Sequence, residues 1–166
     1  DKEVLFFKQM THHLIDLNED FLKDVINVFL IRDPKELIIS FAKVIPEVTM
    51  ERIGVKKQYD LFQKLFSDGQ ESVVVDSGEI LKDPEKVLKE LCEKLGIPFQ
   101  KNMLRWNAGP IAEDGVWAKY WYENVHKSTG FSRPFRKDEE LPEKFIPLYI
   151  ECKKYYNYLK DFSIKA

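Results

Sequence analysis

Three short apolar runs alternate with longer stretches of helical pattern, and this alternation limits the folds open to the chain more than any other feature. The runs cover residues 4–7, 25–31 and 72–75 and are rich in Val, Ile and Phe. Because apolar side chains occupy successive positions, each run predicts a strand that is covered on both faces. Strands separated by helices form parallel sheets. The sequence therefore predicts an α/β fold with a mainly parallel sheet flanked by helices.

Capping residues mark where two of the helices begin. Asp33 and Asp83 each precede a proline at the first helical position, which is a typical helix start. Gly96 is expected to end the second of these helices in the left-handed conformation. The predicted helices cover residues 33–45, 49–66, 83–95, 116–127 and 142–160. Residues 103–114 show no periodicity and contain a Gly-Pro pair, so they are predicted to form a loop.

The composition allows one hydrophobic core. With 166 residues, of which 44% are hydrophobic and 33% charged, the chain is long enough for one such core and too short for two. No repeat or linker divides it, so residues 1–166 are predicted to form a single domain. The 26 basic and 28 acidic residues nearly cancel, which argues against nucleic acid and anionic membranes as partners. Any anion-binding site must be local.

Three features bear on the cellular setting. Cys92 and Cys152 each fall in an apolar helical pattern, which predicts reduced core thiols and a cytoplasmic protein. No apolar run approaches the roughly 20 residues of a membrane span, and the first residues form no targeting segment. The sequence opens without Met and enters an apolar run at Val4, which predicts a chain that is truncated at its N-terminus.

The sharpest candidate site lies where the run 25–31 meets the helix that follows it. Arg32 comes directly after the run, at the expected carboxyl end of a strand, where ligands bind in open parallel sheets. Its guanidinium and the free N–H groups of the helix N-terminus suit phosphate oxygens. Ser40 falls within about 20° of the same helical face as Asp33 and adds a hydroxyl donor. Alternatively, Arg32 pairs with Asp33 or another carboxylate, and Ser40 is a small packing residue.

A second candidate site follows the first run. Lys8, His12 and His13 are ionisable residues just past the expected strand end. A histidine can take a proton from an attacking hydroxyl, while Lys8 can neutralise charge on a transferring group. Vicinal histidines on loops are also common as plain surface residues. A metal site is disfavoured, because the remaining histidine, His126, is distant and no cysteine lies at a ligand spacing.

Two polar residues, Asp76 and Ser77, follow the third run. In a parallel sheet the carboxyl ends of the strands share one edge, so this pair would face the same bound ligand as Arg32. A role in a turn or at a helix start is an equal alternative.

An aromatic segment at residues 115–122 offers a further surface. Trp117, Tyr120 and Trp121 would stack on a base or wall an acceptor pocket, and Lys119 would bond a phosphate. The helical spacing of these aromatic residues suits an ordinary core face equally well.

Taken together, these features resemble the PAPS-dependent sulfotransferases, and most closely the bacterial-type members labelled sulfotransferase-like or branched-chain aminotransferase-like. The resemblance rests on residues 7–14, residues 29–34 with Ser40, and residues 91–99, 106–110 and 115–131. It implies a P-loop NTPase-like sulfotransferase fold. It also implies transfer of a sulfuryl group from PAPS (3′-phosphoadenosine 5′-phosphosulfate) to a hydroxyl or amine of a small-molecule acceptor.

The resemblance assigns roles to the first two candidate sites. It implies that Arg32 and Ser40 grip the 3′-phosphate of the nucleotide. The family's catalytic base is a histidine shortly after a strand-end lysine, which maps onto either His12 or His13, with Lys8 as the lysine.

The resemblance further implies that Trp117 and Lys119 approach the cofactor as secondary contacts. One departure matters, because the family begins with a strand and loop that cradle the 5′-phosphosulfate, and no such segment precedes Val4. We therefore expect a further N-terminal segment of about 60 to 80 residues, without which this chain would not turn over. A kinase-like phosphotransferase and a non-catalytic binding module are the alternatives.

Overall fold

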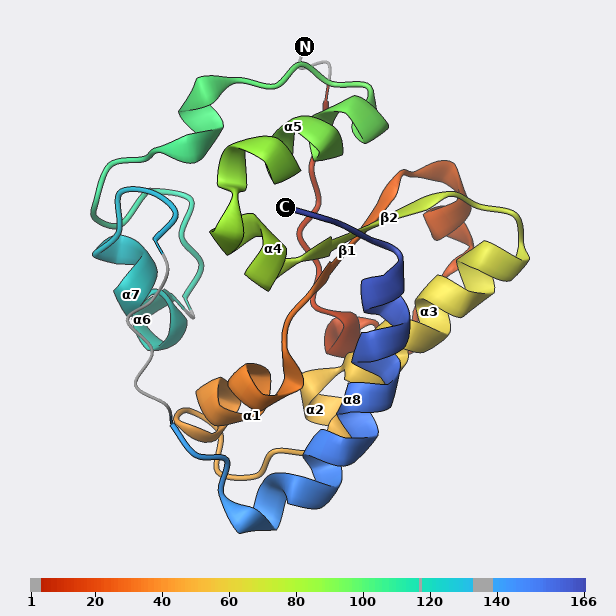
Figure 1. The fold of residues 1–166 in the computed structure, drawn as a ribbon, viewed down its shortest axis with the longest axis vertical. Coiled ribbons are helices and arrows are strands. Elements are labelled where there is room, and N and C mark those ends of the chain that lie inside the picture. Colours follow the sequence, from red (N-terminus) through yellow and green to blue (C-terminus); the bar gives the residue numbers. More distant parts are fainter. Residues whose placement is uncertain (1–3, 117, 133–138) are drawn as a thin grey trace.

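The computed structural model describes residues 4–116, 118–132 and 139–166, and its centre is a small parallel sheet flanked by helices (Figure 1). The strands, in their order across the sheet, are β1 (Asn27–Ile31), β2 (Ser72–Asp76) and β3 (Ser163–Ile164). All pairs are parallel, and β1 and β2 end opposite each other, with Ile31 paired to Asp76. The predicted α/β fold with a parallel sheet is therefore confirmed. The two-residue β3 is too short for a sequence pattern to reveal.

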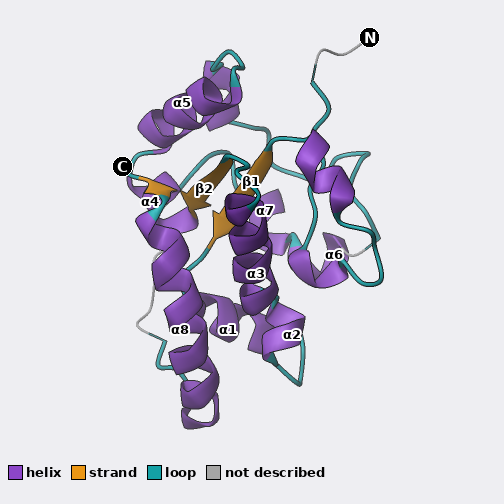
Figure 2. Ribbon diagram, turned by 90° about the vertical axis from the view of Figure 1, so that its right-hand side faces the viewer, coloured by secondary structure: helices purple, strands orange, loops and turns teal. Residues whose placement is uncertain are grey.

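The helices pack around this sheet, with α3 and α8 side by side (Figures 1 and 2). The helices are α1 (Pro34–Ala42), α2 (Met50–Ile53), α3 (Val55–Ser67), α4 (Ser77–Lys82), α5 (Pro84–Leu95), α6 (Ala118–Trp121), α7 (Glu123–His126) and α8 (Ile146–Asp161). Single 3₁₀ turns lie at Thr11–His13, Asp20–Asp24, Lys101–Leu104 and Glu143–Phe145. Among the described residues, none of the helices is long and apolar enough to cross a membrane.

Two apolar clusters hold the elements that carry the candidate site. The first joins β1 and β2 to α3 and α8 and contains Phe29, Ile31, Leu61, Phe62, Leu65, Val74, Tyr156 and Leu159. The second ties α1 to α2 and to the first half of α8 and contains Ile38, Phe41, Val48, Ile53, Val55, Phe145 and Cys152. Because α1 is buried along one side in this way, its other side chains keep a fixed orientation relative to the end of β1.

The two cysteines are free and buried, as expected for core thiols. Burial raises the pKa of Cys152 to about 12. At neutral pH this sulfur is a protonated thiol and a poor nucleophile.

The predicted strand at residues 4–7 is wrong. These residues have no strand conformation, and the side chains of Leu5, Phe6 and Phe7 are between 71% and 83% exposed. An apolar run becomes a strand only where a neighbouring strand supplies hydrogen bonds, and β1 pairs with β2 alone among the described strands. Lys8 and the histidines therefore lie on a loop and not at a strand end.

The sheet also departs from the prediction at β1. Phe29 and Ile31 are buried, whereas Val28 and Leu30 are 38% and 59% exposed. This edge strand is covered on one face by the described residues, although its continuous apolar sequence predicts cover on both.

Two predicted helices are each divided in the structure. The stretch 49–66 forms α2 and α3, because Gly54 adopts a left-handed conformation with φ of +69° between them. The stretch 116–127 contains α6 and α7, each of four residues, and Tyr122 lies between them.

Candidate functional site

Arg32 stands at the carboxyl edge of the sheet, directly after β1. Its Nε lies 3.5 Å from Oε2 of Glu36, and its side chain is 45% exposed. Desolvation lowers the pKa of Arg32, and the charge of the nearby Asp33 carboxylate opposes this shift. The contact with Glu36 is made through Nε. A guanidinium also carries N–H groups on its two Nη nitrogens, and these suit an anion in a forked geometry.

Ser40 lies on the same row of α1 as the residue that Arg32 contacts. Glu36 and Ser40 are four positions apart, and residues at that spacing are neighbours on one helix face. Arg32 contacts Glu36, the residue one turn before Ser40 in this row. Ser40 is half-buried, and no described residue bonds its hydroxyl. The arrangement is compatible with one anion that meets both side chains.

The helix N-terminus makes no such contribution, and this part of the prediction is wrong. Pro34 has no N–H, and the Asp33 carboxylate accepts hydrogen bonds from the N–H groups of Lys35 (2.9 Å) and Glu36 (3.4 Å). The first turn of α1 thus has its donors occupied by its own cap. The candidate phosphate ligands are therefore the side chains of Arg32, which precedes α1, and Ser40 on α1.

Asp76 caps a helix and is buried, with 2% of its surface exposed. Its Oδ1 accepts from the N–H groups of Gly78 (2.5 Å) and Glu79 (3.2 Å), which starts α4. Its Oδ2 accepts a 2.6 Å hydrogen bond from the hydroxyl of Tyr156 on α8. Both oxygens are engaged, so the geometry favours the helix-start role over a nucleotide contact. Ser77 is the half-buried first residue of α4.

The loop that carries the histidines packs against the junction of α2 and α3. The hydroxyl of Thr11 donates to the carbonyl oxygen of Gly54 at 3.1 Å. A Cβ at Gly54 would lie 2.5 Å from Oγ1 of Thr11 and 3.2 Å from the backbone nitrogen of His12. Glycine is therefore required here for close approach as well as for its positive φ.

His12 lies beside α1, and His13 points to solvent. The ring of His12 is 6.4 Å from that of Phe41, the residue after Ser40 on α1. His12 is half-buried and His13 is exposed. Desolvation lowers the pKa of His12, and repulsion from the ring of His13, 4.3 Å away, lowers it further. The structure thus brings one histidine of the pair to the helix that carries Ser40.

The aromatic segment approaches the same region from the other side. Trp121 packs against Phe41 with ring centroids 5.4 Å apart. The ammonium of Lys8 donates to the hydroxyl of Tyr122 at 3.3 Å. Sequence reasoning missed Tyr122, although it belongs to an aromatic cluster that was recognised. The contact joins residues 114 positions apart, so no local pattern indicates it.

Lys119 and Trp117 are the predicted secondary contacts of the cofactor. Lys119 is exposed, and its ammonium lies 4.8 Å over the ring of its neighbour Tyr120. This contact does not direct it to Arg32 or Ser40. Trp117 lies outside the described residues.

A histidine–carboxylate pair holds the aromatic segment to the preceding loop. His126 Nε2 lies 2.8 Å from Oδ2 of Asp114, which also accepts from the backbone N–H of Ile111 at 3.1 Å. These hydrogen bonds lower the pKa of Asp114, the Ile111 bond most. The carbonyl oxygen of His126 accepts from the N–H of Gly109 at 2.7 Å. The predicted loop at residues 103–114 is thereby anchored to α7.

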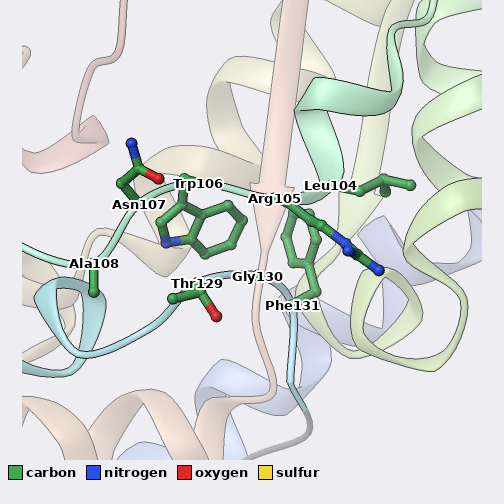
Figure 3. A pocket seen from close by; sticks show the side chains of 8 residues that line it. All are labelled: Leu104, Arg105, Trp106, Asn107, Ala108, Thr129, Gly130 and Phe131. Carbon is green, nitrogen blue, oxygen red and sulfur yellow. The ribbon is translucent and has the colours of Figure 1, made fainter.

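A pocket of about 630 Å³ lies between this loop and the chain that follows α7 (Figure 3). Its walls are residues 104–108 and 129–131. An antiparallel bridge between Arg105 and Gly130 joins the two walls. The sequence does not predict this pocket, because the pocket forms only where two segments without regular secondary structure pack together.

Several known proteins are similar to this chain. Branched-chain-amino-acid aminotransferase-like protein 2 of Arabidopsis thaliana is 36% identical over 160 residues, which cover 96% of this chain and 28% of that protein. Branched-chain-amino-acid aminotransferase-like protein 1 of the same plant is 43% identical over 127 residues, which cover 72% of this chain and 23% of that protein. The chain spans about a quarter of the length of each plant relative.

A solved structure supports the fold. The sulfotransferase domain from the curacin biosynthetic pathway superposes with a TM-score of 0.52 at 18% identity, over 80% of this chain and 52% of that domain. The sequence profile described as the sulfotransferase domain matches residues 2–153. By that match, and in agreement with the parallel sheet and its neighbour of known structure, the chain belongs to the sulfotransferase domain family.

Proposed function

We propose that the protein transfers a sulfuryl group from PAPS to a hydroxyl or amine of a small molecule. The observation that carries the proposal is the guanidinium of Arg32 at the end of β1, which contacts Glu36 through Nε, with Ser40 one helical turn beyond Glu36 on α1. The residues fit a terminal phosphate, because a guanidinium and a hydroxyl both supply hydrogen-bond donors to phosphate oxygens. PAPS would supply the activated sulfuryl group.

In the reaction, the acceptor oxygen or nitrogen forms a bond to sulfur while the bond from sulfur to the 5′-phosphate oxygen breaks. The acceptor loses its proton as it attacks, and the other product is 3′-phosphoadenosine 5′-phosphate. Positioning and charge stabilisation dominate catalysis in group transfer of this kind. The chain must therefore supply an acceptor for the proton and a cation near the transferring group.

His12 is the better candidate for the proton acceptor. Its lowered pKa keeps the imidazole neutral at physiological pH, and a neutral imidazole is the form that accepts a proton. His12 also packs beside α1, whereas His13 is exposed. Lys8 is the candidate cation, and the hydroxyl of Tyr122 fixes its ammonium. The proposed assignment thus selects between two histidines that the sequence leaves equivalent.

Binding of 3′-phosphoadenosine 5′-phosphate tests the nucleotide site. The nucleotide should raise the melting temperature of the wild-type protein, because a ligand at about 100 times its Kd contributes about 2.7 kcal/mol. Arg32→Ala should weaken binding at least about 30-fold, since loss of a charge pair costs about 2–5 kcal/mol. Calorimetric titration gives the Kd.

The matched control is Arg52→Ala. Arg52 is an exposed arginine on α2 that pairs with Glu47, so its loss should leave the Kd unchanged. An unaltered wild-type melting temperature with the nucleotide would contradict the proposal. Protection by ATP with Mg²⁺ alone would favour a kinase-like phosphotransferase instead.

The titration of His12 tests the environment assigned to the base. We expect its pKa to lie below the ordinary value of 6.5 and to rise in His13→Asn, which removes the neighbouring positive charge. The rise should be partial, because desolvation is the larger cause and stays in place. NMR titration of the His12 ring proton measures both values. A pKa at or above 6.5 in the wild-type protein would contradict the assignment.

A further inference from the structure

The pocket between residues 104–108 and 129–131 has two aromatic side chains in its walls, those of Trp106 and Phe131. The indole N–H of Trp106 donates to Oγ of Ser128 at 3.0 Å, and that hydroxyl donates to the carbonyl oxygen of Val125 at 2.7 Å. The rings of Trp106 and Phe131 meet edge to face with centroids 5.3 Å apart. Because the indole N–H already donates a hydrogen bond, the ring offers a flat apolar surface and does not require a polar group from a ligand.

The backbone beneath these rings is fixed as well. The N–H of Trp106 donates to the carbonyl oxygen of Thr129 at 3.2 Å, next to the bridge between Arg105 and Gly130. A Cβ at Gly130 would lie 3.0 Å from the carbonyl oxygen of Leu104, so the walls approach closely at a glycine. A preformed pocket of this kind binds with little cost of ordering.

The charge of the pocket is a single cation. Of the eight described residues that line it, Arg105 is charged and none is acidic. Arg105 is exposed and forms no ion pair with the described residues. In the view of Figure 3 the side chain of Arg105 extends past the ring of Phe131, on the side opposite the indole of Trp106. A flat molecule against the rings would therefore carry its anionic group toward the guanidinium.

We propose that this pocket binds the acceptor, as a flat aromatic molecule that carries one carboxylate. The volume of about 630 Å³ suits a small molecule. One arginine matches one carboxylate, whereas the several phosphate charges of a nucleotide call for more than one cation. The naming of the ligand as an acceptor rests on the proposed function, but the ring and carboxylate specificity does not.

The test follows the indole ¹H–¹⁵N signal of Trp106 while the whole protein is titrated with 4-hydroxybenzoate. The signal is assigned by its loss in Trp106→Phe, and it should shift on binding. The neutral amide of the same shape, 4-hydroxybenzamide, should bind about tenfold more weakly, because a charge-assisted hydrogen bond contributes about that factor. Arg105→Gln should weaken binding of the acid about tenfold and leave the amide unchanged. The control Arg52→Gln, at an exposed arginine of α2, should change neither.

Three results would overturn the inference: an unmoved Trp106 signal at millimolar acid, equal affinities for acid and amide, or competition between 3′-phosphoadenosine 5′-phosphate and the acid. Competition would assign the pocket to the nucleotide. The proposed function is tested separately by nucleotide binding at Arg32. If the nucleotide does not bind while the acid shifts the indole signal of Trp106, the proposed sulfotransferase function is contradicted and the proposed carboxylate pocket is supported.

Discussion

In a protein that includes the N-terminal segment expected from the sequence, we expect His12→Asn to lower kcat for sulfuryl transfer to a phenolic acceptor by a factor of about 10² to 10⁴, because a positioned general base contributes about that much. Asparagine keeps a polar side chain of similar size, but its amide cannot accept the proton. KM should change little, since the missing interaction develops only in the transition state. Initial rates over a range of acceptor concentrations at saturating PAPS give kcat and the KM for the acceptor.

Two controls separate loss of the base from loss of the fold. The melting temperature and the Kd of 3′-phosphoadenosine 5′-phosphate should stay at wild-type values in His12→Asn. His13→Asn should retain most of the activity, because His13 is exposed and does not contact α1 in the way His12 does. A larger loss in His13→Asn than in His12→Asn would reverse the assignment.

Local signals account for the part of the fold that could be predicted. The Asp-Pro pairs at residues 33–34 and 83–84 mark the starts of α1 and α5, and Gly96 ends α5 with φ of +66°. Both starts are capped by the aspartate side chain. Such signals act within one turn of helix, so the chain alone reveals them.

The wrong predictions concern which residues lie next to a strand or a helix terminus. Residues 4–7 are as apolar as β1, yet no described strand pairs with them. At Asp33, the sequence shows a helix start but not that the aspartate has already taken the free N–H groups. Apolar composition and capping patterns show that a segment can form a strand or begin a helix. They do not show which residues pair with that segment or accept its hydrogen bonds.

The candidate site could be predicted in its parts but not in its assembly. Arg32 follows a strand and Ser40 lies on the next helix, as the spacing indicates. The contact of Lys8 with Tyr122 and the packing of His12 on Phe41 join distant segments. Because both contacts depend on tertiary structure, they separate His12 from His13 where sequence reasoning could not.

The final prediction concerns Asp76, for which the sequence left a ligand role and a structural role open. We expect Asp76→Ala to lower the free energy of unfolding by about 2–4 kcal/mol. The change removes the cap of α4, which is worth about 1 kcal/mol, and leaves the buried hydroxyl of Tyr156 without its acceptor, which costs about 1–3 kcal/mol. Urea denaturation measures the loss.

Asp83→Ala is the matched control, because Asp83 caps α5 at the surface, where its side chain accepts an exposed hydrogen bond from the N–H of Lys86. Its loss should cost about 0.5–1 kcal/mol. When Asp76→Ala is made in a protein that already carries Tyr156→Phe, its cost in unfolding free energy should fall close to that of Asp83→Ala. The effects of two residues in one hydrogen-bond network are not additive. The Kd of 3′-phosphoadenosine 5′-phosphate should stay constant in Asp76→Ala at temperatures where the protein is folded. The opposite result would be a tenfold rise in that Kd, together with an unfolding free energy no lower than that of Asp83→Ala. It would place the Asp76 carboxylate at the nucleotide and would contradict the structural role inferred from the hydrogen bonds to both of its oxygens.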